Sequence, residues 1–383
     1  MDVLLLLIAV TAVTGALLVP AALRRRRERE AVRDAVVASS GGGPYGFVPP
    51  EELDVRLPGP DPQLVDALEE AQRTQEWQPV SRLLALTDDW ELRWQRVQSL
   101  AGAAAMELTA ARQQGGKDDT GGPATATAGT DARWLRTWRM ARPDDAGGAE
   151  VYAQFLVWQA MADPGSSVHR IMLEEARKVC HEALEHADEK DPVPLVTELF
   201  VARCLGVDHE EFRRLWERVT ERAPHHMGAH LAALPYWSAQ GRGSREQAYA
   251  FAEAAAAHAP EGSLLPALPL FAVYDHLPDA NLVRGLYQSA VIDRAIQGAL
   301  YAVRHAPEDH AVLPHVRHLL LCFLVRAERY AEALEQVRAV DGYVGAVPWV
   351  DAEDDARAEY AAYRALAVAG YEGQGGARPT PQP

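Results

Sequence analysis

From Asp131 onward, nearly every segment of the chain carries apolar residues at helical spacing, and Pro or Gly separates one segment from the next. No run shows the strict alternation of apolar and polar residues that a half-buried strand requires. Ala, Leu, Arg and Glu are abundant, and aromatic residues make up only 7% of the chain, a balance that favours helices. The pattern predicts an all-α fold in which short breaks join the helices into antiparallel hairpins.

Several of the predicted helices are followed by a proline, at positions 192, 224, 260 and 307. The intervals are 32, 36 and 47 residues, and the first two bracket the helix-turn-helix repeat of about 34 residues. Apolar side chains stand five, eight and twelve residues before each proline, on one helical stripe. The residues at the twelfth position are Cys180, Phe212, Ala248 and Ala295. This regularity predicts stacked helical pairs.

With these features, residues 163–340 resemble the tetratricopeptide-repeat superfamily, in which the terminal proline and the small or aromatic positions recur. The clearest copy is residues 319–340, LLLCFLVRAERYAEALEQVRAV, where RYAEAL is similar to the opening of the repeat's second helix. Glu328 stands where the family's turn usually has Gly, and Val340 replaces a small residue, so the repeats are divergent. The resemblance implies antiparallel helical hairpins stacked as a solenoid. The segments TDDWELRWQRV, WLRTWRMARPDD and PHHMGAHLAALPYW also resemble a family of uncharacterised helical proteins of high-GC bacteria, which implies no particular activity.

Residues 3–23, VLLLLIAVTAVTGALLVPAAL, contain no charged side chain. At about 1.5 Å per residue, a helix of this length crosses the roughly 30 Å apolar core of a bilayer. A cleaved secretory signal would need positive charge before the apolar stretch, but here the positive residues follow it, as Arg24, Arg25, Arg26 and Arg27. The positive-inside rule therefore predicts a single-pass protein of the cell membrane, with its N-terminus outside, residues 1–23 as the transmembrane anchor and the soluble domain in the cytoplasm.

Composition divides the rest of the chain. Residues 24–38 predict a basic juxtamembrane helix, which either enforces topology or lies against anionic lipid headgroups. Residues 39–62 are dense in Gly and Pro and predict a linker. Residues 63–370 predict a helical repeat-like domain with a disordered insertion at 113–130, and residues 371–383 predict a disordered tail.

The charge balance narrows the class of partner. The chain has 38 Lys and Arg against 54 Asp and Glu, a net charge of −16 at pH 7. This balance argues against a partner made of nucleic acid and favours protein or peptide partners that are basic or neutral. Only three lysines are present, so the lysine-rich clamp that some tetratricopeptide proteins use on peptide carboxyl termini lacks its residues. The three cysteines form no CxxC pair and predict neither a disulfide framework nor a thiolate zinc site.

Histidine is the residue type whose clustering suggests chemistry. His226 and His230 lie at i and i+4, and His315 and His318 share a second helical face. Two histidines on one face can bind a metal, but residues 227–229 lack the glutamate that HExxH would supply as general base. No nucleophile elbow, phosphate-binding Gly-rich loop or carboxylate pair accompanies them. We therefore predict no catalytic residue, no metal site and no cofactor, and keep a metal-dependent enzyme using these histidines as the alternative.

The leading functional hypothesis is a membrane-anchored cytoplasmic scaffold or adaptor for protein–protein interaction, bound to the bilayer through residues 3–23. In stacked helical pairs the first helices usually line the groove. This nominates five binding residues: His226, His230, Trp237, His315 and His318. Trp237 fits a packed core as well as a binding anchor. A lipid-surface sensor built on residues 24–33 is a third possibility.

Overall fold

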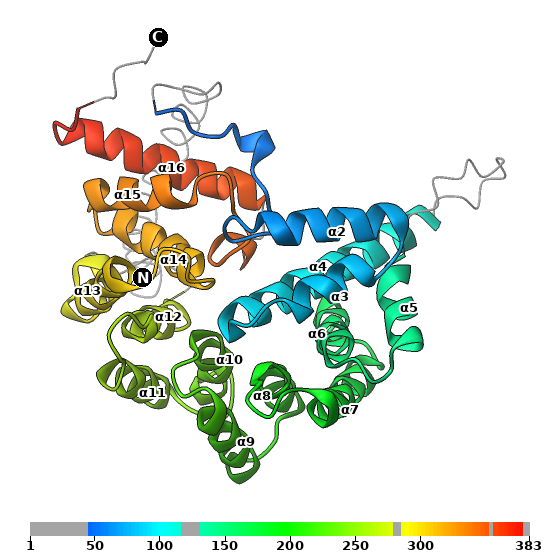
Figure 1. Cartoon of the computed structure of the whole chain (residues 1–383). Coiled ribbons are helices and arrows are strands. Elements are labelled where there is room, and N and C mark those ends of the chain that lie inside the picture. Colours follow the sequence, from blue (N-terminus) through cyan, green and yellow to red (C-terminus); the bar gives the residue numbers. More distant parts are fainter. Residues whose placement is uncertain (1–44, 116–130, 279–284, 352–354, 378–383) are drawn as a thin grey trace, which may run out of the picture. The chain divides into compact units, whose positions relative to one another are not determined.

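The computed structural model describes residues 45–115, 131–278, 285–351 and 355–377, and most of these fold into helices (Figure 1). They form fifteen α-helices and four 3-10 helices, and the described ranges contain no β-strand beyond one isolated bridge between Asp54 and Tyr343. The prediction of an all-α fold is confirmed. Within the same ranges, no helix combines the length and the apolar character that crossing a bilayer requires. The predicted span at residues 3–23 and the arginines that follow it lie outside the described residues.

The contacts divide the chain into two compact units, where the sequence predicted a single domain over residues 63–370. The central unit comprises residues 59–277 and 294–316. The terminal unit comprises the described parts of residues 1–58, 278–293 and 317–383. Helix α13 (Ala290–His305) and helix α14 (Leu313–Arg326) each contribute residues to both units.

The central unit contains all the helices from α2 to α12. Their bounds are α2 (Pro62–Thr74), α3 (Gln78–Ala85), α4 (Trp90–Gly115), α5 (Arg133–Ala141), α6 (Ala146–Ala162), α7 (His169–His186), α8 (Val193–Leu205), α9 (His209–Arg222), α10 (Met227–Trp237), α11 (Arg245–Ala257), the 3-10 helix η2 (Leu265–Ala267) and α12 (Leu268–Tyr274).

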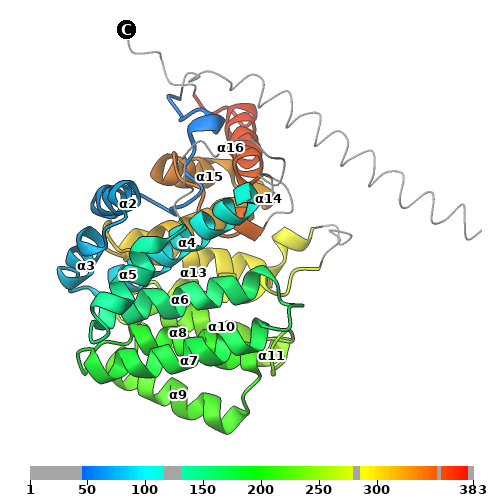
Figure 2. The ribbon, with the colours of Figure 1, turned by 90° about the vertical axis from the view of Figure 1, so that its right-hand side faces the viewer.

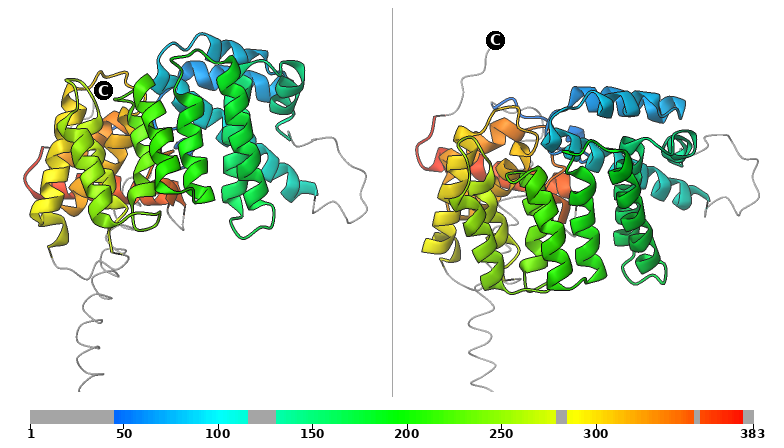
Figure 3. Two further views of the ribbon diagram at one scale, coloured as in Figure 1. Left: turned by 90° about the horizontal axis from the view of Figure 1, so that it is seen from below. Right: turned by 60° about the horizontal axis from the view of Figure 1, so that its bottom comes forward.

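Helices of two kinds alternate from α6 to α12. Helices α6, α8, α10 and α12, here called the inner helices, are buried around most of their circumference. Each inner helix packs against the next: α6 on α8, α8 on α10, and α10 on α12. Helices α7, α9 and α11 bury one stripe and expose the other face, as α9 does with Phe212, Leu215 and Val219. Figures 2 and 3 show these green helices side by side.

Local sequence signals explain where these helices begin and end. Asp89, just before α4, accepts a hydrogen bond from the Leu92 backbone N–H at 2.7 Å. Asp208 caps α9 in the same way, through the Glu211 N–H at 2.8 Å. Helices α9, α11 and α13 end two or three residues before Pro224, Pro260 and Pro307, because proline cannot continue the helical hydrogen-bond ladder, whereas α7 ends six residues before Pro192. The residues twelve positions before these prolines are all buried, as the predicted stripe requires.

The terminal unit contains most of α14 together with α15 (Tyr330–Val340), α16 (Ala356–Gly373) and the 3-10 helices η1 (Pro50–Glu52), η3 (Leu286–Gln288) and η4 (Trp349–Asp351). Residues 45–58 pack within this unit, although the sequence predicted a linker over 39–62. Leu53 and Leu57 are buried, and Arg357 Nε donates to the Leu53 carbonyl at 2.9 Å. The Gly and Pro content of this segment indicates a linker, but its two buried leucines hold it in the core of the terminal unit.

Candidate functional site

Two of the predicted groove residues lie at the start of α10, and both are buried. His226 is the N-cap: its Nδ1 accepts a hydrogen bond from the Ala229 N–H at 3.0 Å, and its Nε2 lies 3.3 Å from the Trp90 carbonyl oxygen. His230 Nδ1 bonds the His226 carbonyl oxygen at 3.0 Å, and its ring packs edge-on against Trp216. Burial lowers the pKa of each imidazole to about 4. Both side chains are therefore neutral packing and capping residues near pH 7.

Trp237, at the end of α10, is half-buried in an aromatic cluster. Its ring stacks on His209 at 5.9 Å and meets Phe212 and Tyr236 edge-on. These contacts belong to the core between α9 and α10, so the structure favours the core interpretation of Trp237 over the binding anchor.

The second histidine pair is divided between the two units. His315 Nε2 bonds the Gln95 side-chain oxygen at 2.9 Å within the central unit, and burial lowers the His315 pKa to about 4. His318 is fully buried in the terminal unit, where Nε2 bonds the Pro58 carbonyl oxygen at 2.9 Å and Nδ1 accepts from Trp349 Nε1 at 2.9 Å. The two rings thus serve different cores and do not line a common binding face.

Helix α4 explains why the central-unit histidines are covered. This helix packs against three of the inner helices, α6, α8 and α10 (Figure 1). The Glu91 carboxylate accepts hydrogen bonds from the backbone N–H groups of Met227 and Gly228 at the start of α10, the latter at 3.2 Å. The Trp94 ring lies directly against Gly228. His226 and His315 were predicted to line a binding groove, and in the structure both rings contact α4 instead, through the Trp90 carbonyl oxygen and the Gln95 side chain.

A buried charge cluster holds α4 against α6 and α8. Arg93 Nε and Nη2 donate to the two Glu150 carboxylate oxygens at 3.0 and 3.1 Å, and Arg93 Nε also lies 3.2 Å from Asp191 Oδ2. The carboxyl groups of Glu150 and Asp191 are hydrogen-bonded to each other. Burial raises the pKa of Glu150 to about 8 and also raises the pKa of Asp191. No sequence motif marked these three residues, which come from distant parts of the chain.

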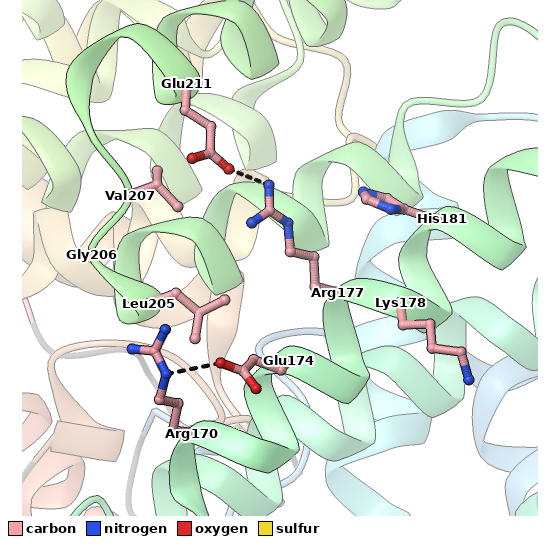
Figure 4. A pocket seen from close by; sticks show the side chains of 9 residues that line it. All are labelled: Arg170, Glu174, Arg177, Lys178, His181, Leu205, Gly206, Val207 and Glu211. Carbon is pink, nitrogen blue, oxygen red and sulfur yellow. Dashed lines mark hydrogen bonds and ion pairs between the residues drawn. The ribbon is translucent and has the colours of Figure 1, made fainter.

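The central unit also has an open pocket on its surface, among α7, the end of α8 and the start of α9. It encloses about 520 Å³. We call it the outer pocket, and Figure 4 shows its lining residues: Arg170, Glu174, Arg177, Lys178, His181, Leu205, Gly206, Val207 and Glu211. Sequence reasoning nominated none of them, because acidic and basic residues on an amphipathic helix usually indicate only a solvated face.

The rim of the outer pocket is neutralised by ion pairs within the chain. Arg170 Nε lies 2.8 Å from Glu174 Oε1, and the Arg177 guanidinium pairs with the Glu211 carboxylate. Lys178 Nζ lies 3.5 Å from Glu182 Oε1. The rim therefore offers both signs of charge without a strong excess of either.

A smaller chamber of about 150 Å³ adjoins the outer pocket and shares Arg177 and Glu211 with it. Glu198 of α8 also lines it, with a side chain that is only 3% exposed. Glu198 Oε1 accepts a hydrogen bond from His181 Nε2 at 2.9 Å. Among the described residues, no group donates a hydrogen bond to Glu198 Oε2 or accepts one from Arg177 Nε. The chamber therefore has one uncommitted acceptor and one uncommitted donor.

Metal-binding geometry is absent from the residues that the structure describes, since they contain no group of three or more His, Cys, Asp or Glu side chains placed to hold an ion. No protein-family model, curated protein or solved structure matches the chain.

Proposed function

We propose that the chain is a membrane-anchored helical scaffold that binds a protein partner at the outer pocket. The observation that carries this proposal is the contrast between two surfaces of the central unit. The inner face, where a repeat protein would bind a peptide, is filled by α4, whereas the outer pocket is open and lined by polar side chains. A partner would dock on α7, α8 and α9 rather than in a groove.

The finer architecture within this proposal is a divergent tetratricopeptide-like stack. Alternation of inner and amphipathic helices supports it, and so do the prolines that follow α7, α9, α11 and α13. A shared turn adds to this support. Gly206 after α8 and Glu328 after α14 both have left-handed backbone, with φ of 69° and 62°.

The membrane part of the proposal rests on the composition of residues 3–23 and on Arg24 to Arg27. It places the N-terminus outside and both described units in the cytoplasm. A reporter enzyme that is active only in the cytoplasm, fused after Pro383, should be active in whole cells. Activity only of a reporter that requires export would overturn this topology.

The scaffold function is tested by capture of the full chain from detergent-solubilised membranes. Arg170 and Lys178 have side chains that are 70% and 65% exposed, so reversing both charges to Glu changes the rim without disturbing the core. We expect a stoichiometric partner to be recovered with the wild-type chain and lost with the double variant. A matched control reverses Arg73 and Arg245, which are exposed on α2 and α11.

The control variant should retain the partner. Recovery that is equal with all three proteins would contradict docking at the outer pocket, and recovery of no stoichiometric partner with the wild-type chain would contradict the scaffold itself.

A further inference from the structure

We propose that the chamber beside the outer pocket binds the primary carboxamide of an Asn or Gln side chain on the partner. This inference deepens the proposed scaffold function and rests on it for the identity of the partner as a protein. The juxtaposition that carries it lies in the lining of the chamber: among the described residues, the buried acceptor Glu198 Oε2 receives no hydrogen bond and the buried donor Arg177 Nε gives none.

The acceptor is held in place by its neighbours. His181 fixes Glu198 through Oε1, which leaves the second oxygen of the carboxylate for the chamber. The nearest ion-pair partner of Oε2 is Arg218 Nη1 at 3.9 Å, which is beyond hydrogen-bond distance. A buried carboxylate oxygen without a donor is costly, so a ligand group that donates a hydrogen bond is stabilised here.

The donor is held just as firmly. The Arg177 guanidinium pairs with Glu211 from α9, and its Nε lies 3.4 Å from Glu198 Oε1. That pair is an ionic contact and leaves the Nε hydrogen without an acceptor among the described residues. The ligand must therefore accept one hydrogen bond and donate another within a few ångströms.

Chemistry selects among the possible ligand groups. A carboxylate would accept from Arg177 but would face Glu198 with like charge, whereas an ammonium would donate to Glu198 but face Arg177. A trans peptide bond directs its N–H and C=O to opposite sides and cannot satisfy both groups from one edge. A primary carboxamide carries a donor and an acceptor on the same edge. Its neutral charge agrees with the charge balance of the rim.

The test uses the full chain in detergent micelles and four blocked tripeptides, acetyl-Ala-X-Ala-N-methylamide with X as Gln, Glu, Lys or Leu, so that the Gln side chain is the only primary carboxamide in the set. Backbone amides are constant in this set, so only the side chain differs. Saturation-transfer NMR should give binding of the Gln peptide that is at least about tenfold tighter than that of the other three. Equal binding of the four peptides, or no binding of the Gln peptide, overturns the proposal.

Glu198→Gln provides the sharper arm of the test. The Gln oxygen keeps the His181 hydrogen bond and places its NH₂ where Oε2 was, so the chamber then presents two donors. The preference should reverse, with the Glu peptide now at least about tenfold tighter than the Gln peptide. Glu185→Gln, at an exposed position of the same helix as His181, is the matched control and should leave the preference unchanged. An unchanged preference in Glu198→Gln overturns the proposal.

A second variant covers the case in which Glu198→Gln does not fold, which a circular dichroism melt reports. Arg177→Lys keeps the positive charge beside Glu211 and removes the Nε donor from a side chain that is one-third exposed. It should weaken the Gln peptide about tenfold, and full affinity in this variant counts against the proposal. Failure of the peptide panel, with partner capture still dependent on Arg170 and Lys178, would reject the carboxamide and leave the scaffold function standing.

Discussion

Three ionisable side chains lie in the interior of the central unit: Arg93, Glu150 and Asp191. A net charge buried there would destabilise the fold. Two carboxyl groups that share a hydrogen bond next to one guanidinium bind one proton as a pair. With that proton bound, the cluster has no net charge. Folding around Glu150 therefore takes up a proton near neutral pH.

This proton uptake predicts how stability changes with pH. The Glu150 pKa is raised from 4.5 in the unfolded chain to about 8, so between these values the folded state binds more protons and the free energy of unfolding falls as pH rises. Glu91, with its pKa raised by burial to about 7, acts in the same direction. Between pH 6.5 and 8 we expect the Glu150 contribution to fall by up to about 1.4 kcal/mol per pH unit. Urea titrations at several pH values measure it.

Glu150→Gln removes this contribution, because the amide has nearly the same shape but does not titrate, although it retains only one of the two hydrogen bonds from Arg93. Its stability should decline less steeply than that of the wild type from pH 6.5 to 8, while exposed Glu185→Gln serves as the control. The three buried histidines have depressed pKa values, so they raise stability as pH rises through about 6.5, but they do so equally in both proteins and cancel in the comparison. Identical slopes for wild type and Glu150→Gln would refute proton uptake by this cluster.

At the scale of elements, the Trp94 ring of α4 packs closely against Gly228 of α10. A Cβ on Gly228 would lie 2.7 Å from the Trp94 ring, closer than side chains pack. We expect Gly228→Ala to lower the free energy of unfolding by roughly 1–3 kcal/mol, because ring or backbone must shift. Thermal or urea unfolding measures it. In a Trp94→Leu background, Gly228→Ala should lower the free energy of unfolding by less. Strictly additive effects of the two substitutions in this double-mutant cycle would contradict the contact.

The turns between helices give a second prediction. Glu328 adopts a left-handed conformation that costs a residue with a Cβ about 1–2 kcal/mol, so Glu328→Gly should stabilise the terminal unit by about 1 kcal/mol. Gly206→Ala should destabilise the central unit by a similar amount through strain alone, since the new methyl group would meet only Arg242 Nη2 at an ordinary 3.6 Å. The unfolding midpoints of the two variants should therefore move in opposite directions, and shifts in the same direction would exclude backbone strain as the cause.

Helix positions were largely predictable because they depend on local signals. The helices predicted before Pro192 and Pro224 are present as α7 (His169–His186) and α9 (His209–Arg222), since apolar spacing, N-caps and prolines all act within a few residues. The site was not predictable in this way. The cover of α4 over His226 depends on Gly228 meeting Trp94, and the chamber depends on His181, Glu198 and Arg177 converging from two helices. Neither set of contacts corresponds to a recognisable spacing of residues in the sequence.

At the scale of the whole molecule, chain order and compact units do not coincide. The terminal unit assembles residues 45–58 with a short middle segment and the C-terminal helices, so its stability depends on residues far apart in sequence. Asp54 N–H bonds the Gly342 carbonyl oxygen at 2.8 Å, and Arg364 Nη1 bonds both the Val48 carbonyl oxygen and Asp341 Oδ1 at 2.7 Å. Such long-range contacts make residues 45–58 an integral part of this core rather than a tether.

Leu53→Ala tests this dependence. Leu53 is 1% exposed, and truncation of a buried leucine costs about 2–5 kcal/mol because it leaves a cavity. Hydrogen exchange followed by mass spectrometry should show faster exchange in α16, which contacts this segment, with α7 to α9 of the central unit as the internal reference. Glu51→Ala, at an exposed position two residues earlier, should leave both regions unchanged. If Leu53→Ala and Glu51→Ala exchange alike, residues 45–58 act as the linker that their composition suggests, and the terminal unit is stable without them.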